Sequence, residues 1–170
     1  MKLACGIDPG LHGAIAIVGD DGKEFLIDDM PLIRGKRPVI DIGRVRELLE
    51  HLVGDLDVTG LVAVERQSVR PQQSSQSGLK IGYGEGILVG LLAGMRIPYL
   101  RPTPQEWKGV MLMGTDRSKQ AARITAQALY PRAPLGRRAD EGRSDAILLA
   151  RFALARMGSS ATLEASAPAV

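Results

Sequence analysis

Acidic residues follow two apolar runs of the sequence and recur in a third segment near its C-terminal end. Asp8 closes the run LACGID and Glu65 closes the run GLVAVE, while Glu141 and Asp145 stand four residues apart in DEGRSDAILLARF. An unpaired carboxylate in an apolar setting is costly, so each acid needs a cation or a network of hydrogen bonds nearby. Taken singly, Asp8 could be a turn residue and Glu65 a salt-bridge partner in a loop.

Taken together, these acids predict a site for divalent cations. Continuous apolar runs are typical of buried parallel strands, and open α/β sheets bind ligands at the edge where such strands end. Carboxylates with no nearby pair of His or Cys suit Mg²⁺, with Mn²⁺ as a substitute, and do not suit zinc. Such clusters hold two ions about 3.5–4 Å apart, which activate a water and stabilise a departing phosphate oxygen. We expect Asp8, at the end of a rigid strand, to bridge the two ions.

The third acidic segment allows two interpretations. Glu141 and Asp145 share a helix face that continues into apolar residues as far as Phe152, so this face is expected to point at the sheet. Acids in the first turn of a helix also complement the helix dipole, and for Asp140 and Glu141 this interpretation is as good as a functional one. Asp145 lies more than one turn into the helix, where the dipole explains it less well.

The elements that must position these acids follow from periodicity and turn signals. Strands are expected over about 3–8, 14–18, 24–28, 60–65 and 96–102, with a loop over 31–40. Helices are expected over about 42–53 with Asp41 as N-cap, 76–94, 104–111 with a capping box from Thr103, and 140–157, and another is capped by Thr115 or Asp116 and ends near 129. This order predicts an α/β fold, a mixed sheet with helices on both faces. One domain covers 1–157, and 158–170 is expected to be a flexible tail.

Composition restricts the class of protein further. The chain has 170 residues, 45% of them apolar and 4% aromatic, so aliphatic side chains must fill a single core. The single cysteine, Cys5, and the lack of a signal peptide or long apolar span predict a reducing cytoplasm and no membrane. The net charge of +3 and the pI of about 9.2 hint at nucleic acid. Two basic clusters could be solvated loops or binding patches: Arg34, Lys36 and Arg37, and Arg132, Arg137 and Arg138.

Five segments carry a resemblance to a known family: GIDPGLHGAIAIV, LVAVERQ, SGLKIGYGEGILVG, PTPQEWKGVMLMGTDRSKQAARITAQALYP and SDAILLA. In this order and spacing they resemble the RuvC-type Holliday junction resolvases of the RNase H-like superfamily. The resemblance covers the chain as far as about residue 157. It is strongest with the RuvC-like proteins of phages, whose last motif has the form of EGRSDA. The resemblance implies an RNase H-like mixed five-stranded sheet.

The resemblance also implies roles for individual residues. Asp8, Glu65 and Asp145 match the metal-binding carboxylates of the family. Glu141 matches the fourth ligand of the phage pattern, with Asp140 as the alternative, whereas bacterial RuvC has this acid at the position occupied here by Gly142. Lys108 and Lys119 match basic residues that the family uses near the scissile phosphate, although each could also be an ordinary solvated lysine.

One departure from the family and one expected partner follow. Bacterial RuvC carries an aromatic wedge residue shortly after the second acid, whereas the loop RQSVRPQQSSQ contains none, so junction opening would have to rely on other groups. Resolvases of this family act as homodimers that cut two strands symmetrically. The glycine-rich helix expected over 76–94 is a candidate interface, and packing against its own sheet is the alternative.

The implied function is that of a metal-dependent crossover junction endodeoxyribonuclease. It would resolve four-way junctions and other branched DNA by phosphodiester hydrolysis, leaving 5′-phosphate ends, in the cytoplasm of a bacterium or of a phage-infected host. The alternatives are a YqgF-like RNA-processing nuclease and a non-catalytic module that binds branched DNA. A kinase-like phosphotransferase shares the opening Asp-Gly hairpin but needs two such domains, for which 170 residues are too few.

Overall fold

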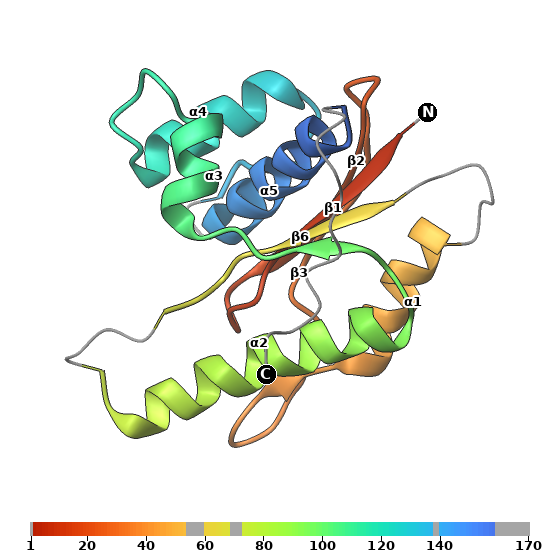
Figure 1. The fold of residues 1–170 in the computed structure, drawn as a ribbon. Helices are drawn as coiled ribbons and strands as arrows, with labels where there is room; N and C mark the ends of the chain where they lie inside the picture. The colour runs from red at the N-terminus through yellow and green to blue at the C-terminus, as the bar shows by residue number, and fades with distance from the viewer. Residues whose placement is uncertain (1, 54–59, 69–72, 138–139, 159–170) are drawn as a thin grey trace.

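A single five-stranded sheet runs through the protein, with helices on both faces (Figure 1). The computed structural model describes residues 2–53, 60–68, 73–137 and 140–158. The strand order is β3-β2-β1-β6-β7, in which β1, β2 and β3 are antiparallel neighbours and β6 and β7 run parallel to β1. The strands are β1 Leu3–Asp8, β2 Ala14–Gly19, β3 Glu24–Asp29, β6 Leu61–Val64 and β7 Tyr99–Leu100. The expected mixed five-stranded α/β sheet is therefore confirmed.

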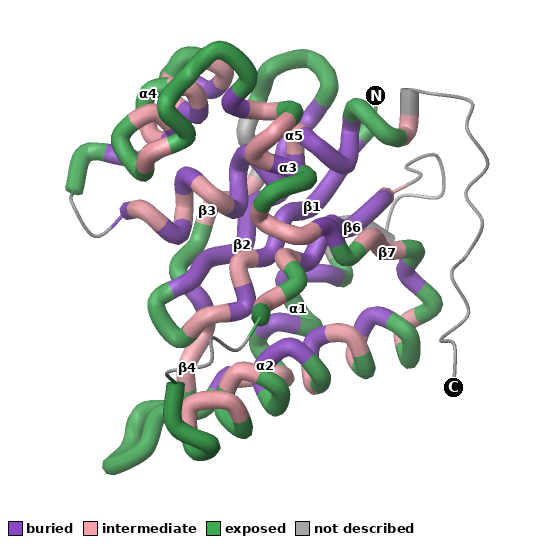
Figure 2. The backbone as a smooth tube through the Cα atoms, turned by 60° about the vertical axis from the view of Figure 1, so that its left-hand side comes forward, coloured by how far each residue is buried: buried purple, intermediate pink, exposed green. Residues whose placement is uncertain are grey.

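The described residues form five helices, which divide between the two faces of the sheet. Their bounds are α1 Ile42–Val53, α2 Ser75–Gly94, α3 Pro104–Met111, α4 Lys119–Leu129 and α5 Glu141–Gly158. In Figure 1, α3, α4 and α5 lie on one face and α1 and α2 on the other. Figure 2 shows that the central strands and the inner sides of these helices are buried. None of the described helices combines the length and the apolar character that crossing a membrane requires.

The two faces of the sheet differ in the size of their side chains. Small residues such as Ala4 and Ala63 point toward α3, α4 and α5, whereas Ile7 and Val64 point toward α1 and α2. At Gly6 a Cβ would lie only 1.9 Å from the carbonyl oxygen of Ala146, so α5 rests directly on the backbone of β1. Small residues on one strand face therefore allow one helix to approach closely, and this helix carries the third acidic segment.

Most of the expected helix starts are confirmed, and one is wrong. Asp41 accepts a hydrogen bond from the Arg44 N–H at 3.0 Å, and Thr103 forms a capping box at the start of α3. α4 is capped by Ser118, and not by the expected Thr115 or Asp116. Both of those side chains bind backbone N–H groups two residues further along, so they shape the turn before the helix.

The segment expected as a loop over 31–40 contains a small second sheet. β4 Leu32–Ile33 and β5 Val39–Ile40 pair antiparallel, so the expectation of a loop is corrected. Ile40 is buried in the core on the α1 and α2 side, which gives this short hairpin an apolar anchor. The residues 159–170 of the expected tail, 69–72 of the loop after Glu65, and Arg138 lie outside the described residues.

The glycines of α2 have little to do with packing on the sheet. At Gly84 a Cβ would meet neighbouring atoms, at 3.4 Å from the Pro9 carbonyl oxygen, whereas at Gly82, Gly86 and Gly90 it would meet open space. Leu79 is 75% exposed on the same helix. Packing on its own sheet therefore accounts for one of these glycines and leaves the others unexplained.

Candidate active site

Asp8 and Glu65 lie side by side because their strands are neighbours in the sheet. β1 and β6 run parallel, with Ile7 paired to Val64, so the next residue of each strand is an acid at the same edge. The Glu65 N–H donates to the Ile7 carbonyl at 3.0 Å, which extends the pairing up to the acids themselves. The sequence-based expectation that two strands end in adjacent carboxylates is met by the structure.

The turn after β1 holds the Asp8 carboxylate. The Gly10 N–H donates to Asp8 Oδ1 at 3.3 Å, and the Gly13 N–H closes the turn on the Gly10 carbonyl at 2.9 Å. A Cβ at Gly13 would lie 2.1 Å from the Asp8 carbonyl oxygen, so only glycine fits there. The turn therefore fixes the orientation of Asp8 relative to the sheet.

The N-terminal end of α5 is pressed against this same turn. A Cβ at Gly142 would lie 2.6 Å from the His12 carbonyl oxygen. No larger residue fits at this position, which is where bacterial RuvC carries its fourth acid. Glu141 and Asp145 flank Gly142 on the first turns of the helix, so the close approach carries both of them to the edge where β1 and β6 end.

α3 closes the edge from the side and brings two further polar groups. The Trp107 indole N–H donates to Glu65 Oε2 at 3.2 Å. The Lys108 ammonium lies 3.9 Å from Asp145 Oδ2 and 5.0 Å from the centre of the Trp107 ring. Sequence reasoning identified Lys108 but missed Trp107. A signal was present, since Trp107 is the only tryptophan of the chain and directly precedes Lys108.

The three inner carboxylates repel one another in a poorly solvated setting. Burial raises the pKa of Glu65 to about 7, and the charges of Asp8 and Asp145 add to this shift. Burial also raises the pKa of Asp145 to about 6, where Asp8 and Glu141 act in the same direction and Lys108 and Lys119 oppose it. The pKa of Asp8 is likewise raised by burial, against the Gly10 hydrogen bond and the two lysines. The charge of Asp8 therefore affects the protonation of both Glu65 and Asp145.

Glu141 and Lys119 form an ion pair at the rim of this group. Both side chains are partly exposed, at 43% for Glu141 and 73% for Lys119. The structure therefore brings together all six residues expected at the site, with three acids inside, one acid at the rim and a lysine beside each end of the group.

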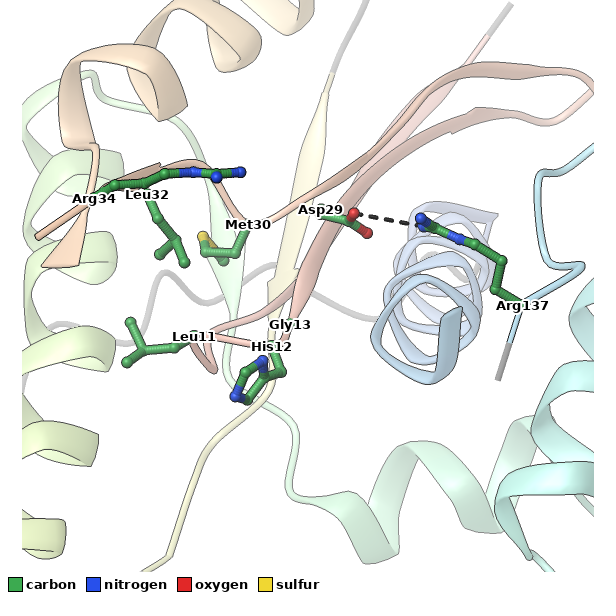
Figure 3. Close-up of a pocket in the computed structure, with 8 residues that line it drawn as sticks. All are labelled: Leu11, His12, Gly13, Asp29, Met30, Leu32, Arg34 and Arg137. Carbon is green, nitrogen blue, oxygen red and sulfur yellow. Dashed lines mark ion pairs between the residues drawn. The ribbon is translucent and has the colours of Figure 1, made fainter. Parts of the chain in front are cut away.

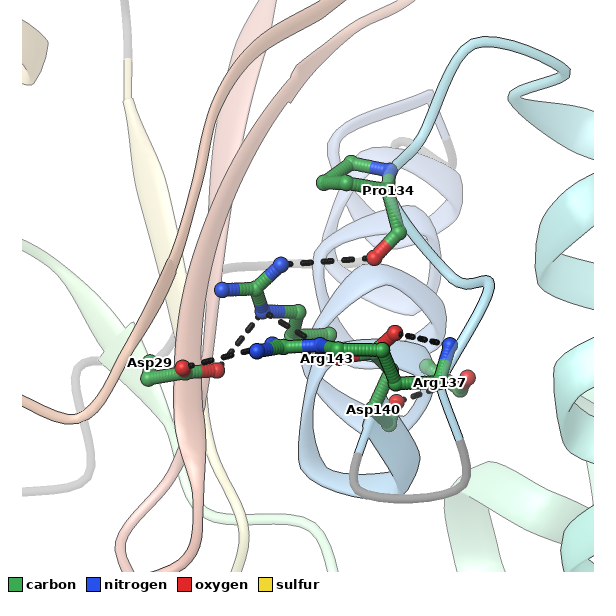
Figure 4. Close-up of polar contacts among 6 residues, drawn as sticks. Asp29, Pro134, Arg137, Asp140 and Arg143 are labelled. Carbon is green, nitrogen blue, oxygen red and sulfur yellow. Dashed lines mark hydrogen bonds and ion pairs between the residues drawn. The ribbon is translucent and has the colours of Figure 1, made fainter.

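Asp140, the alternative fourth ligand, is bound elsewhere. Its side chain is 1% exposed, and Arg137 donates its backbone N–H to Oδ2 at 2.7 Å and its guanidinium to Oδ1 at 2.9 and 2.7 Å. Burial raises the pKa of Asp140, but the contacts with Arg137 outweigh this and hold the pKa below its usual value. Arg143 joins the network by donating to Asp29 at 2.6 Å and to the Pro134 carbonyl at 3.3 Å (Figure 4). These contacts tie the loop before α5 to β3.

A pocket of about 320 Å³ lies at the β1–β2 turn (Figure 3). Apolar side chains and two arginines from separate basic clusters of the sequence meet there. The lining residues are Leu11, His12, Gly13, Asp29, Met30, Leu32, Arg34 and Arg137. Arg137 is paired with Asp140 and Asp29, whereas Arg34 reaches in from the β4–β5 hairpin. Apolar and cationic groups side by side suit the sugar and phosphate of a nucleotide.

The acids at the edge fit a hard divalent cation in type and charge. All are carboxylates, and among the described residues no arginine forms an ion pair with Asp8, Glu65 or Asp145 as Arg137 does with Asp140. Within the part of the chain that the structure describes, no group of three or more His, Cys, Asp or Glu side chains forms a ready metal site. The fit is therefore one of chemistry and position, since the carboxylates do not form a closed coordination sphere.

Comparisons with known proteins agree on the fold. No protein-family model matches the sequence, and no curated protein matches it significantly. The fold is similar to that of Thermus thermophilus RuvC in complex with a Holliday junction substrate, with 18% identity, 93% of this chain and 97% of that chain covered, and a TM-score of 0.66. A second structure of Thermus thermophilus RuvC is also similar, with 18% identity, 92% of this chain and 96% of that chain covered, and a TM-score of 0.58. The chain therefore has a RuvC-like α/β fold.

Proposed function

We propose that the protein is a metal-dependent endonuclease that cuts branched DNA, four-way junctions above all. It would hydrolyse phosphodiester bonds and leave 5′-phosphate and 3′-hydroxyl ends, in the cytoplasm of a bacterium or of a phage-infected cell. The observation that carries this proposal is the convergence of Asp8, Glu65 and Asp145 at one edge of a RuvC-like sheet. Support for the substrate comes from the similar RuvC structure, which is a complex with a Holliday junction.

The acids would hold two Mg²⁺ ions, or Mn²⁺ in their place. Asp8, Glu65 and Asp145 would be ligands, and we propose Glu141 as the fourth, as in the phage pattern, because the oxygens of Asp140 are taken by Arg137. Two bound ions would supply the activation of a water molecule and the stabilisation of charge on the leaving 3′-oxygen. Asp8 is held by β1 and by the Gly10 N–H, so its carboxylate would be offered to the ions in a fixed orientation.

The lysines would hold the DNA phosphate. Lys108 and Lys119 stand on α3 and α4 at the two ends of the acidic group, where they now pair with Asp145 and Glu141. When cations neutralise those acids, the ammonium groups become available to the oxygens of the scissile phosphate. Arg34 and the pocket beside the turn would receive the backbone next to the cut, so binding should weaken steeply with salt.

A homodimer belongs to this proposal, because two active sites are needed to cut two strands of a junction symmetrically. The open glycines and the exposed Leu79 and Tyr83 on α2 support this helix as the interface. Sedimentation of the protein without DNA tests the dimer. A sharp monomer peak at micromolar concentration would contradict it.

Cleavage of a synthetic four-way junction is the direct test. We expect the wild type to make paired nicks in Mg²⁺ or Mn²⁺ and none in EDTA. Asp8→Asn should bind the junction without cutting it, because it keeps the shape of the side chain and removes a ligand charge. Asp21→Asn, in the β2–β3 hairpin and paired with Lys23, is the control and should cut like the wild type.

The same assay separates the alternatives. Cleavage of structured RNA in place of the junction would favour an RNA-processing nuclease. Junction binding with no metal-dependent cleavage of any branched substrate would favour a non-catalytic module. Undiminished cleavage by Asp8→Asn would show that the acidic edge, formed by Asp8, Glu65, Glu141 and Asp145, is not the active site.

A further inference from the structure

Trp107 touches the acidic edge without supplying a ligand to it. Its side chain is fully buried on α3, and its indole N–H donates to Glu65 Oε2 at 3.2 Å, across 42 residues of sequence. A buried indole N–H needs an acceptor, and here the acceptor is a carboxylate of the acidic edge. This hydrogen bond engages one oxygen of Glu65 and restricts the rotation of its carboxylate.

The same ring also places Lys108. The ammonium of Lys108 lies 5.0 Å from the ring centre and 3.9 Å from Asp145 Oδ2. A cation over an aromatic face is held by the ring quadrupole, most strongly for tryptophan. One side chain therefore contacts Glu65 directly and Asp145 through Lys108, so its position sets the separation of two acids that come from different elements.

Rigid elements hold the ring where it is. The Arg66 N–H donates to the Pro102 carbonyl at 2.9 Å, which joins the end of β6 to the segment leading into α3. Thr103 and Glu106 then cap the helix. Trp107 itself packs in the core cluster shared with α5. A group held from three sides in this way can fix its hydrogen-bond partner to within a fraction of an ångström.

We propose that Trp107 is a positioning residue for metal binding: it holds Glu65 and Lys108 in the arrangement that lets the acidic edge bind divalent cations. The inference rests on the proposed function only in that Glu65 is a metal ligand. Hydrogen-bond partners of metal ligands typically change metal affinity by about 10–100-fold when they are removed. We therefore expect the loss of the indole N–H to weaken metal binding before it affects the fold.

The wild-type protein offers a direct optical readout. Trp107 is its only tryptophan, so the fluorescence of the protein reports the surroundings of this one ring. Titration of the DNA-free protein with Mn²⁺ or Mg²⁺ should change the emission in a saturable way. Glu65→Gln should abolish this change, because the ion no longer reaches the partner of the ring. A saturable change that persists unaltered in Glu65→Gln would overturn the inference.

Trp107→Phe keeps a ring and removes only the N–H. Calorimetric titration with Mn²⁺ should show about tenfold weaker binding, and the Mg²⁺ concentration for half-maximal cleavage should rise by the same factor. The turnover rate at saturating Mg²⁺ should stay within about threefold of the wild type. Such a separation of affinity from turnover is not expected of a residue that acts only in folding.

Tyr130→Phe is the matched control. Tyr130 is another buried aromatic, and its hydroxyl donates to the Gly19 carbonyl at 3.3 Å, at the opposite end of β2 from the acidic edge. This variant should lose a comparable hydrogen bond and bind Mn²⁺ like the wild type. Wild-type affinity in Trp107→Phe, or an equal loss in both variants, would overturn the inference. If metal binding depends on Trp107 but the protein cuts no DNA, the inference stands and only the proposed nuclease function fails.

Discussion

Asp140 and Asp145 lie five residues apart at the start of one helix, and their surroundings shift their pKa values in opposite directions. The carboxylate of Asp140 is enclosed by the backbone and guanidinium of Arg137, which hold its pKa below the usual value against the effect of burial. Burial raises the pKa of Asp145 to about 6, and the Lys108 ammonium lies 3.9 Å from its Oδ2. One acid is fully compensated within the protein, and the other keeps negative charge that is not.

The comparison separates structural acids from acids available to a ligand. A carboxylate whose oxygens are filled by an arginine stabilises the fold and has nothing left to offer a cation. A carboxylate that lies near others, and whose neighbouring lysines only partly offset burial and repulsion, is stabilised in its charged form by a bound cation. Asp140 and Asp145 are the same residue type at the start of the same helix, so only the groups that surround their carboxylates distinguish them.

The largest expected effect concerns activity. Asp145→Asn should reduce metal-dependent cleavage of a four-way junction by on the order of 10³-fold, because bound cations contribute several kcal/mol of transition-state stabilisation. Asp140→Asn should cut at the wild-type rate per folded molecule. Single-turnover cleavage at saturating Mg²⁺ measures both variants.

Asp140→Asn serves as the matched control, since it removes one charge from the same helix end. It should lower the free energy of unfolding by about 1–3 kcal/mol, because it leaves the contacts of Arg137 incompletely satisfied. Urea unfolding measures this loss. Strong loss of cleavage in Asp140→Asn with an intact fold would reverse the comparison and make Asp140 the ligand.

A smaller effect concerns pH and stability without metal. A carboxyl whose pKa is higher in the folded protein binds more protons folded than unfolded, so stability falls as pH rises between its two pKa values. For Glu65 this window runs from 4.5 to about 7, and for Asp145 from 3.8 to about 6. Stability in EDTA should therefore fall from pH 5 to pH 8 by on the order of 1 kcal/mol more in the wild type than in Glu65→Gln. Urea unfolding at both pH values checks this difference.

Added Mn²⁺ should change the sign of this trend, since cations bind the deprotonated carboxylates and stabilise the folded protein more at pH 8. Glu65→Gln should respond weakly. An identical pH dependence in wild type and Glu65→Gln, with and without metal, would mean that Glu65 is as well compensated as Asp140.

The smallest expected effect tests the basic side of the turn. Arg34→Ala should weaken junction binding a few fold and reduce the slope of log affinity against log salt by about 1, as for the loss of one phosphate contact. Arg46→Ala, an exposed arginine of α1 paired with Glu50, is the control and should leave the slope unchanged. Fluorescence anisotropy in Ca²⁺ at several salt concentrations measures both. Equal slopes for Arg34→Ala and the wild type would remove the pocket from the DNA path.

Much of the fold could be predicted because its signals are local. The apolar runs ending in Asp8 and Glu65 are typical of parallel strands, and the capping box of Thr103 and Glu106 predicts the start of α3 from four consecutive residues. The start of α4 was misplaced because Thr115, Asp116 and Ser118 are all acceptable N-caps, and the choice depends on which of them shapes the turn. The short β4–β5 hairpin was missed because its pairing is stabilised by burial of Ile40 in a distant core.

The sequence by itself determined which acids end the strands and which helices follow them, because hydrophobic period and capping chemistry act over a few neighbouring residues. Only the tertiary structure decided which acid of the α5 start is fully compensated by an arginine and which is not. Arg137 binds Asp140 from three residues away, whereas the lysine beside Asp145 is Lys108, which lies on a different helix. The sequence places Arg137 near several acids, and only the folded arrangement shows which of them it binds.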